Sequence, residues 1–415
     1  MRLIVVRKMS INTVLLMLSL LCVSTYAFLE HTSIAIAAFS SVKQPLLIMG
    51  AVCLVPLIGI FFPKLNRKGY LMTFTALFVL LVILFAVMMA TKDLTYSDSV
   101  VRNTFRLMLY LVDLFVLMVT AAEMGEGQRV LRFLLRYVLI LMVVSDLLMF
   151  TGLASFKSGR HDAYLVGSKF SVSYLHMNFL ALWALNQKKT LRSYRIPLWK
   201  VLFAAAYIVA VAIRTDCMTG ILGCVMLIAL FMIIESPRRD RFLRFSSPWM
   251  LLLFLVGSVV FAFAAEVIMQ LPFMKFIVEN IFGRDASITG RTTIYYLYIS
   301  TIPEHWLTGY GFGSANAVTS ALFGYDNVQN ALLQWVLQIG VIGTLGLVAL
   351  MMTIFKQITW KNAKNMPKIL ILIALIYMYV ILGAIETSFN MSFLLWFGLI
   401  FMLTNEKTPQ RRRAM

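Results

Sequence analysis

Apolar runs long enough to cross a membrane recur along the whole chain, and they constrain its fold more than any other feature. A helix needs roughly 20 apolar residues to cross the hydrocarbon core of a bilayer. Because the backbone in hydrocarbon must satisfy its own hydrogen bonds, each run is predicted to be a helix. The runs lie near residues 11–29, 44–62, 70–91, 107–123, 133–151, 170–186, 197–213, 218–235, 248–271, 329–355, 369–385 and 391–404.

Composition supports the same class of protein. Of the 415 residues, 61% are hydrophobic and 13% are charged, whereas roughly 25% are charged in soluble domains. We therefore predict an all-α, polytopic integral membrane protein with about twelve transmembrane helices, forming a single domain over residues 1–415. The four cysteines lack the spacing of a zinc site and no Asp-x-Asp motif occurs, so neither a metal nor another cofactor is expected.

Basic residues predict how the helices are oriented, because cytoplasmic loops are enriched in Lys and Arg. With the N-terminus in the cytoplasm, 26 of the 37 lysines and arginines fall on the cytoplasmic side and 11 on the outer side. Both termini of this multi-pass chain are therefore predicted to lie on the cytoplasmic side of the cell membrane. The same asymmetry accounts for the net charge of +19, so nucleic acid is not an expected partner.

One long polar stretch, residues 272–328, interrupts the apolar pattern between the ninth and tenth predicted helices. The predicted topology places it outside the cytoplasm. A loop of this length in a compact protein is usually functional or disordered. Its aromatic residues argue for an ordered extracytoplasmic loop. These residues include Trp306, Tyr310, Phe312, Phe323 and Tyr325.

Arginines on the predicted outer side run against the usual charge bias, so they need an explanation. The guanidinium group suits bidentate binding of phosphate. We therefore take Arg160, Arg214 and Arg291 as candidates for holding a lipid diphosphate. The alternative is that these side chains only extend to lipid head groups.

Other ionisable residues leave two readings open. Asp113 and Asp146 fall inside predicted helices, where a carboxylate is a functional hypothesis by default, but each could simply bond a neighbouring helix. Histidine can act as a general base near neutral pH, which applies to His161, His176 and His305. A histidine buried in a helix, such as His176, could equally bond a neighbour.

The segment TGYGFGSA, residues 308–315, alternates glycine with aromatic residues. It does not match the G-x-G-x-x-G dinucleotide pattern. Its glycines permit a tight turn near the membrane surface, where Tyr310 and Phe312 could stack on sugar rings or pack at the interfacial aromatic belt.

Together with DNVQNALLQWVLQIGVIGTLGLV from Asp326, the stretch SITGRTTIYYLYISTIPEHWLTGYGFGSA from Ser287 resembles the signature of the O-antigen ligase/polymerase superfamily, notably the Wzy-type polymerases. The residues that match in order are Gly290-Arg291, the glycines between 309 and 313, Asn330, and Gly340 to Gly343. RTDCMTGIL from Arg214 is similar to a helix opening of the same family. The frequent family histidine before the asparagine is Gln329 here, so a base role does not carry over to that position. In its place His305, or a carboxylate such as Glu304 or Asp326, would have to serve, or no base is needed.

The resemblance implies a GT-C-like membrane glycosyltransferase that needs no metal. It would join undecaprenyl-diphosphate-linked oligosaccharide repeat units into capsular, exo- or O-antigen polysaccharide at the outer face of the membrane. A flippase and a chain-length regulator would be further partners beside the lipid bilayer. The candidate catalytic residues are His305 and Glu304. The candidates for binding sugar or acceptor are Tyr310, Asp326, Asn330, His161 and His176.

Two alternatives stay open at this point. A ligase of the same superfamily would transfer finished glycan to another acceptor. A flippase or secondary transporter would be expected to show repeat symmetry and several polar groups at the membrane midplane, whereas the polarity of this chain is concentrated outside.

Overall fold

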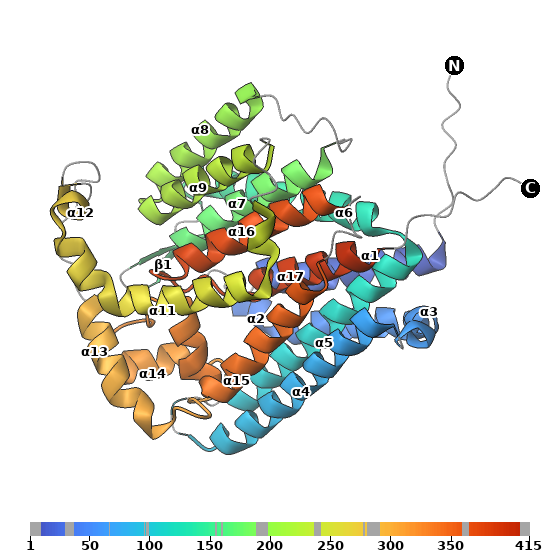
Figure 1. The fold of residues 1–415 in the computed structure, drawn as a ribbon, viewed down its shortest axis with the longest axis horizontal. Coiled ribbons are helices and arrows are strands. Elements are labelled where there is room, and N and C mark those ends of the chain that lie inside the picture. The colour runs from blue at the N-terminus through green and yellow to red at the C-terminus, as the bar shows by residue number, and fades with distance from the viewer. Residues whose placement is uncertain are drawn as a thin grey trace, which may run out of the picture.

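Each of the twelve apolar runs overlaps a long helix in the computed structural model (Figure 1). The structure describes residues 10–29, 37–65, 67–94, 96, 99–153, 156–158, 161–187, 198–235, 242–276, 279, 291–358 and 365–406. The long helices are α1 (Ile11–Phe28), α2 (Ala37–Leu54), α4 (Lys68–Thr91), α5 (Val100–Met124), α6 (Gly127–Phe150), α7 (Lys169–Asn186), α8 (Leu198–Arg214), α9 (Met218–Glu235), α11 (Pro248–Gln270), α15 (Ala331–Lys356), α16 (Met366–Leu382) and α17 (Met391–Asn405).

Shorter elements connect them. Near α2 and before α11 these are η2 (Val55–Leu57), α3 (Ile58–Phe61), η3 (Phe62–Lys64) and η4 (Leu243–Ser246). Between α11 and α15 they are α12 (Pro272–Phe276), α13 (Arg291–Thr301), η6 (Ile302–Glu304) and α14 (Ala315–Leu322). The connection between α6 and α7 differs from the all-helical prediction. It contains a short antiparallel pair of strands, β1 (Phe156–Ser158) and β2 (His161–Ala163).

Length and apolarity identify the membrane-crossing helices. Among the described residues, six helices are long and apolar enough to cross a membrane, and five further apolar helices are shorter. The chain is therefore a polytopic helical membrane protein by composition and architecture. The total of twelve spans stays a prediction.

The core of the bundle is formed by α16 and α17. Every residue of α17 from Met391 to Leu403 is buried, and a helix that is apolar all round is expected to lie inside a bundle. Phe393 illustrates the packing, because its ring stacks on Phe389 with 4.3 Å between centroids. In contrast, α8 exposes Phe203 at 74% and α4 exposes Phe78 at 66%, as expected for helices that face lipid.

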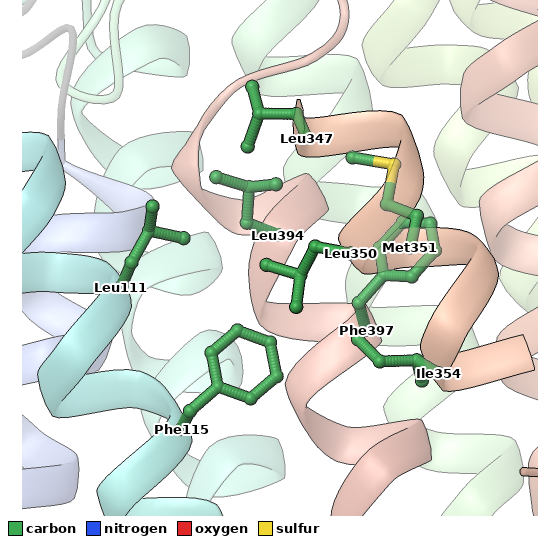
Figure 2. Close-up of a pocket in the computed structure, with 8 residues that line it drawn as sticks. All are labelled: Leu111, Phe115, Leu347, Leu350, Met351, Ile354, Leu394 and Phe397. Carbon is green, nitrogen blue, oxygen red and sulfur yellow. The ribbon is translucent and has the colours of Figure 1, made fainter. Parts of the chain in front are cut away.

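A small apolar gap remains inside the bundle where α5, α15 and α17 meet (Figure 2). All eight side chains that line it are hydrocarbon, aromatic or thioether groups, so it offers no polar group that could orient a sugar. They are Leu111, Phe115, Leu347, Leu350, Met351, Ile354, Leu394 and Phe397.

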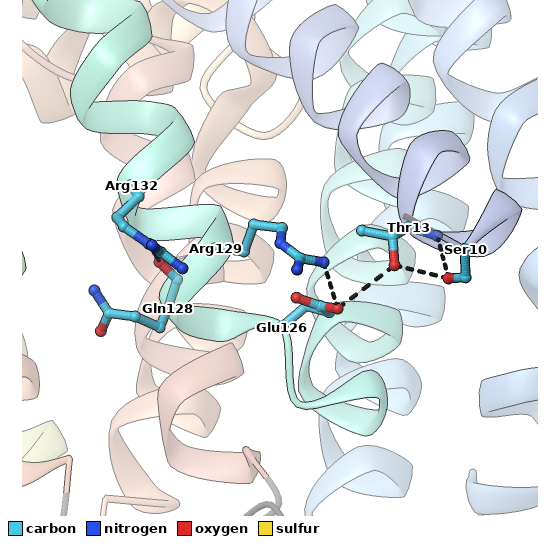
Figure 3. A network of polar contacts seen from close by, with 6 residues as sticks. All are labelled: Ser10, Thr13, Glu126, Gln128, Arg129 and Arg132. Carbon is cyan, nitrogen blue, oxygen red and sulfur yellow. Dashed lines mark hydrogen bonds and ion pairs between the residues drawn. The ribbon is translucent and has the colours of Figure 1, made fainter. Parts of the chain in front are cut away.

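One end of the bundle is joined by polar contacts between helix termini. Figure 3 shows Glu126, in the turn between α5 and α6, accepting hydrogen bonds from Arg129 at 2.7 Å and from Thr13 of α1 at 3.5 Å. Gln128 contacts Asn186 at the end of α7 (3.2 Å) and Lys368 at the start of α16 (2.7 Å). These are the helix ends that the charge count predicts to be cytoplasmic, and they lie on one common face.

Candidate functional site

The opposite ends of the same helices form the face that we call the outer face, following the predicted topology. It comprises the α4–α5 connection, the start of α7, the α8–α9 turn, residues 291–340 and the α16–α17 connection. Backbone bonds link these segments, for example from Ala331 N–H to the carbonyl oxygen of Gly383 at 2.8 Å. In Figure 1, α12, α13 and α14 gather on this side of the bundle.

Arg214 is the last residue of α8 and is exposed on the outer face. The helix ends in a Schellman-type turn, since Cys217 N–H donates to Ala212 O at 2.8 Å and Asp216 N–H donates to Ile213 O at 3.0 Å. Asp216 takes the left-handed position of this motif, with φ 49°, where glycine is the usual residue. A cation in the last turn also interacts favourably with the helix dipole.

Lys169, the first residue of α7, bonds the turn between α8 and α9. Its Nζ donates to the carbonyl oxygen of Asp216 at 3.1 Å and lies 3.8 Å from the carboxylate of the same residue. The turn that carries Arg214 is therefore held from two sides, by its own backbone bonds and by α7.

The other two candidate arginines are only partly open to description. Arg160 lies outside the described residues, as do the side chains of Arg291 and His161. The backbone of residue 291 begins α13, and that helix docks on the start of α15. Tyr295 Oη donates to Gln329 O at 3.0 Å, and Tyr298 Oη donates to Leu333 O at 3.1 Å. Burial raises the pKa of the Tyr298 hydroxyl, which keeps it a neutral donor.

Asn330, a residue of the signature, is fully buried and caps α15. Its Oδ1 accepts from the amides of Leu332 at 3.1 Å and Leu333 at 3.0 Å, which is the ordinary role of an N-cap asparagine. Its Nδ2 donates to Ser258 O at 3.1 Å and Ala384 O at 3.3 Å. A sugar could reach this amide only by displacing one of these contacts.

The glycines of the signature bring two backbone segments into direct contact. Gly340 has φ 66° and interrupts α15 with a kink. Tyr310 N–H donates to Leu337 O at 2.8 Å on one side of the kink, and Ile342 N–H donates to Leu307 O at 3.3 Å on the other. A Cβ atom on Gly309 would lie 2.6 Å from the amide nitrogen of Gly340, so neither position has room for a side chain.

The candidate catalytic residues lie at this kink. Glu304 is exposed and His305 is half-buried. The ring of His305 meets the ring of Tyr310 edge-on, with 4.6 Å between centroids. Tyr310 itself is buried and donates to Thr301 O at 3.3 Å. Burial, with the nearby Glu304 carboxylate, raises the pKa of the Tyr310 hydroxyl.

The helical segment from Ala331 to Ile339 separates these groups from Asn330. At 1.5 Å per residue this segment spans roughly 13 Å. The structure thus places Glu304, His305 and Tyr310 at one end of the segment and Asn330 at the other. Asp326 is exposed in the loop that leads to Asn330.

The structure also buries a carboxylate on the outer face that the sequence analysis did not single out, Glu386, which is 3% exposed. It lies two residues after Ala384, whose carbonyl oxygen accepts the hydrogen bond from Asn330. Burial raises the pKa of the Cys217 thiol, and the negative charge of the Glu386 carboxylate adds to this rise. A lone acidic residue in the otherwise apolar or neutral run ILGAIETSFN was the available signal.

His176 and Asp146 meet inside the bundle. His176 is fully buried, with Nδ1 2.8 Å from Val172 O and Nε2 3.0 Å from Asp146 Oδ2. Asp146 thus bonds a neighbouring helix, which was one of its two interpretations from the sequence. A sugar could reach His176 only by displacing one of these contacts. Asp113 is buried, and no described residue hydrogen-bonds its Oδ2.

No metal centre is evident in the described part of the chain. Within those residues, no three His, Cys, Asp or Glu side chains group closely enough to hold an ion.

These observations define a multi-pass helical membrane protein with a polar outer face built around glycine-dependent backbone contacts. Residues 203–348 match the family model described as O-antigen ligase. The match runs from α8 through the Arg214 turn and the glycine-rich loop to the helix after the Gly340 kink. It therefore confirms the resemblance to the O-antigen ligase/polymerase superfamily, which indicates a glycan transfer of polymerase or ligase type. No curated protein sequence matches the chain at a significant level.

Proposed function

We propose that this protein is a polymerase that joins undecaprenyl-diphosphate-linked oligosaccharide repeat units into capsular, exo- or O-antigen polysaccharide at the outer face of the cell membrane. The observation that carries the proposal is the family match over residues 203–348, which includes Arg214 and the glycine-dependent kink. A lipid-linked glycan is the substrate that such a family implies, and an outer face with an exposed arginine suits its diphosphate.

The proposed reaction breaks the bond between the anomeric carbon of the donor sugar and its phosphate oxygen. A hydroxyl at the non-reducing end of the acceptor repeat unit forms the new glycosidic bond, and undecaprenyl diphosphate leaves. Negative charge grows on the leaving phosphate in the transition state. A preorganised guanidinium group stabilises that charge, which is the role assigned to Arg214 and, by proposal, to Arg160 and Arg291.

The acceptor hydroxyl must lose a proton as it attacks. His305 and Glu304 are the proposed proton acceptors, because they flank the kinked segment on the outer face and neither is buried. Tyr310, Asp326, Asn330, His161 and His176 stay proposed contacts for sugar or acceptor. Tyr310, Asn330 and His176 already bond other groups of the protein, which favours a role in supporting the site over direct contact with sugar.

The test is reconstitution of the full chain in lipid vesicles with an undecaprenyl-diphosphate oligosaccharide repeat unit. We expect a ladder of glycan products with regular increments, together with release of undecaprenyl diphosphate. Arg214→Ala serves as the inactive control. Movement of the substrate across the bilayer without any new glycosidic bond would replace the proposal with a flippase or transporter.

A ligase is the second candidate, because the matching family model carries that description. It would transfer a finished glycan to a different acceptor and give a single product instead of a ladder. The same reconstitution separates the two when a lipid or oligosaccharide acceptor is supplied. Cooperation with a flippase and a chain-length regulator is part of the polymerase proposal.

A further inference from the structure

We propose that Asp146, His176 and Tyr207 form a unit that positions Arg214 for its diphosphate ligand. The inference rests on the proposed function, since it takes Arg214 as the residue that holds the lipid diphosphate. The three side chains come from α6, α7 and α8, and none of them is assigned to the diphosphate by the sequence signature. In this role they are positioning residues that act through Arg214.

The unit is a chain of short hydrogen bonds centred on one carboxylate oxygen. Asp146 Oδ2 lies 3.0 Å from His176 Nε2 and accepts a hydrogen bond from Tyr207 Oη at 2.6 Å. Asp146 and His176 are 3% and 0% exposed, whereas Tyr207 is 38% exposed. The buried pair thus binds the hydroxyl group of a tyrosine that is itself partly exposed at the surface of the bundle.

Hydrogen-bond partners decide the proton count of the pair. The carbonyl oxygen of Val172, 2.8 Å from His176 Nδ1, can only accept, so Nδ1 carries a hydrogen. The contact between Nε2 and Oδ2 then needs one shared proton. The pair is either an imidazolium beside a carboxylate or an imidazole beside a carboxylic acid. Its net charge is zero in both forms, which avoids an isolated charge inside the bundle.

Helix geometry connects this unit to Arg214. Tyr207 and Arg214 are seven residues apart on α8, so they lie on the same face of the helix, two turns or about 10 Å apart along its axis. A side chain held at Tyr207 therefore fixes the direction in which Arg214 leaves the helix.

Apolar packing sets the approximate rotation of α8, because Ile208, Val211 and Ala212 are buried with at most 3% exposure. The helix packs against α7 and α9 and exposes Trp199, Phe203 and Ile213, each by more than 60%. Lipid-facing apolar groups gain little from one rotation over another. A rotation of about 20° would move a group at the roughly 6 Å outer radius of a helix by about 2 Å. A displacement of that size is enough to weaken bidentate contacts to phosphate.

The outer end of α8 is anchored to the same neighbour. Lys169 of α7 bonds the carbonyl oxygen of Asp216, just past Arg214. His176, also on α7, contacts Asp146, which in turn bonds Tyr207 two turns before Arg214 on α8. Contacts that start from α7 therefore hold α8 both before and after Arg214 along the chain.

The test is a double-mutant cycle read out as affinity for undecaprenyl diphosphate, measured on purified, monodisperse protein so that only folded molecules count. Tyr207→Phe removes one hydroxyl and keeps the ring. We expect it to weaken binding by about three- to tenfold, a loss that stays within the energy of one hydrogen bond because the bond acts only by positioning Arg214. In an Arg214→Ala background the same change should alter binding by less than about twofold, because the unit then has no arginine to position.

Tyr377→Phe is the matched control. It also removes a tyrosine hydroxyl bond, to Phe245 O at 2.8 Å, but on α16 and η4, away from Arg214. Its affinity for undecaprenyl diphosphate should equal that of the unmodified protein.

The outcomes separate the two proposals. If Arg214→Ala binds undecaprenyl diphosphate as tightly as the unmodified protein, the assignment of Arg214 itself fails. If Arg214→Ala binds weakly but Tyr207→Phe binds normally, or loses affinity equally in both backgrounds, the positioning role is overturned while the diphosphate assignment stands.

Discussion

The backbone amide of Val341 donates a hydrogen bond to the carbonyl oxygen of Trp306, with 2.9 Å between nitrogen and oxygen. This bond joins the second half of α15 to the loop that carries Glu304 and His305. It exists only because Gly340 leaves the helical conformation, which frees the amide of Val341 from the usual partner four residues earlier. The kink therefore fixes the candidate catalytic loop to a long helix of the bundle.

Gly340→Ala should disrupt this junction. An alanine at φ 66° is strained, and its Cβ would collide with the backbone of Leu307 and Thr308. We expect a loss of at least about 2 kcal/mol of stability, together with loss of polymer formation. Thermal unfolding of the purified protein measures the first effect. Gly257→Ala is the control, because no atom beyond its chain neighbours and its own helix backbone lies within 4 Å of the added Cβ, so its melting temperature should not fall.

Arg214→Ala should abolish polymer formation without reducing the amount of inserted protein. The side chain is exposed at the end of α8, so its removal leaves no buried group unpaired. Loss of one charge-stabilising donor lowers the rate by roughly 100-fold or more. Arg214→Lys keeps the charge but loses the planar fork, so we expect partial activity. Polymer at normal levels from Arg214→Ala would refute the role, and Arg132→Ala on the opposite face is the control.

Asn330→Ala should destabilise the start of α15. It removes the N-cap, worth about 1 kcal/mol, and takes one donor away from each of the carbonyl oxygens of Ser258 and Ala384. We expect a total loss of about 2 kcal/mol in chemical or thermal unfolding. Ser168 is the N-cap residue of α7 but makes no capping hydrogen bond, so Ser168→Ala should leave stability unchanged. An equal effect of the two changes would contradict the assignment.

Accessible cysteines test the orientation of the bundle. In a Cys53→Ser background, where the three remaining natural cysteines are buried, Ser320→Cys on α14 should react with a membrane-impermeant maleimide added outside intact cells. Arg132→Cys, exposed at the opposite end, should react only after permeabilisation. The reverse pattern would overturn the topology inferred from the charges.

Helix positions followed closely from apolarity where no charge intervened. The run predicted at 218–235 is α9, Met218–Glu235, and the run at 11–29 is α1, Ile11–Phe28. The run at 107–123 was too short, because α5 begins at Val100. Arg102 and Arg106 ended the apolar pattern there, yet a helix can continue beyond the hydrocarbon. The run predicted at 44–62 began too late and ended too late, because α2 spans Ala37–Leu54 and includes Pro45.

The candidate site was predictable in its residue types more than in its contacts. The signature pointed to Arg214, Asn330 and the glycines before the structure was known. The kink at Gly340 was not predicted, because an apolar run with one glycine is compatible with a continuous helix. Only the docking of residues 306–310 shows why the helix breaks there.

Hydropathy and charge act locally and through the solvent, so the sequence by itself determined the class of protein, the positions of its helices and the superfamily that it resembles. The tertiary structure alone decided which polar groups meet. Tyr207 bonds Asp146 from 61 residues away, and Asn330 bonds Ala384 from 54 residues away. Hydrogen bonds are short and directional, so such pairs form only where the packing of several helices brings two particular atoms within about 3 Å.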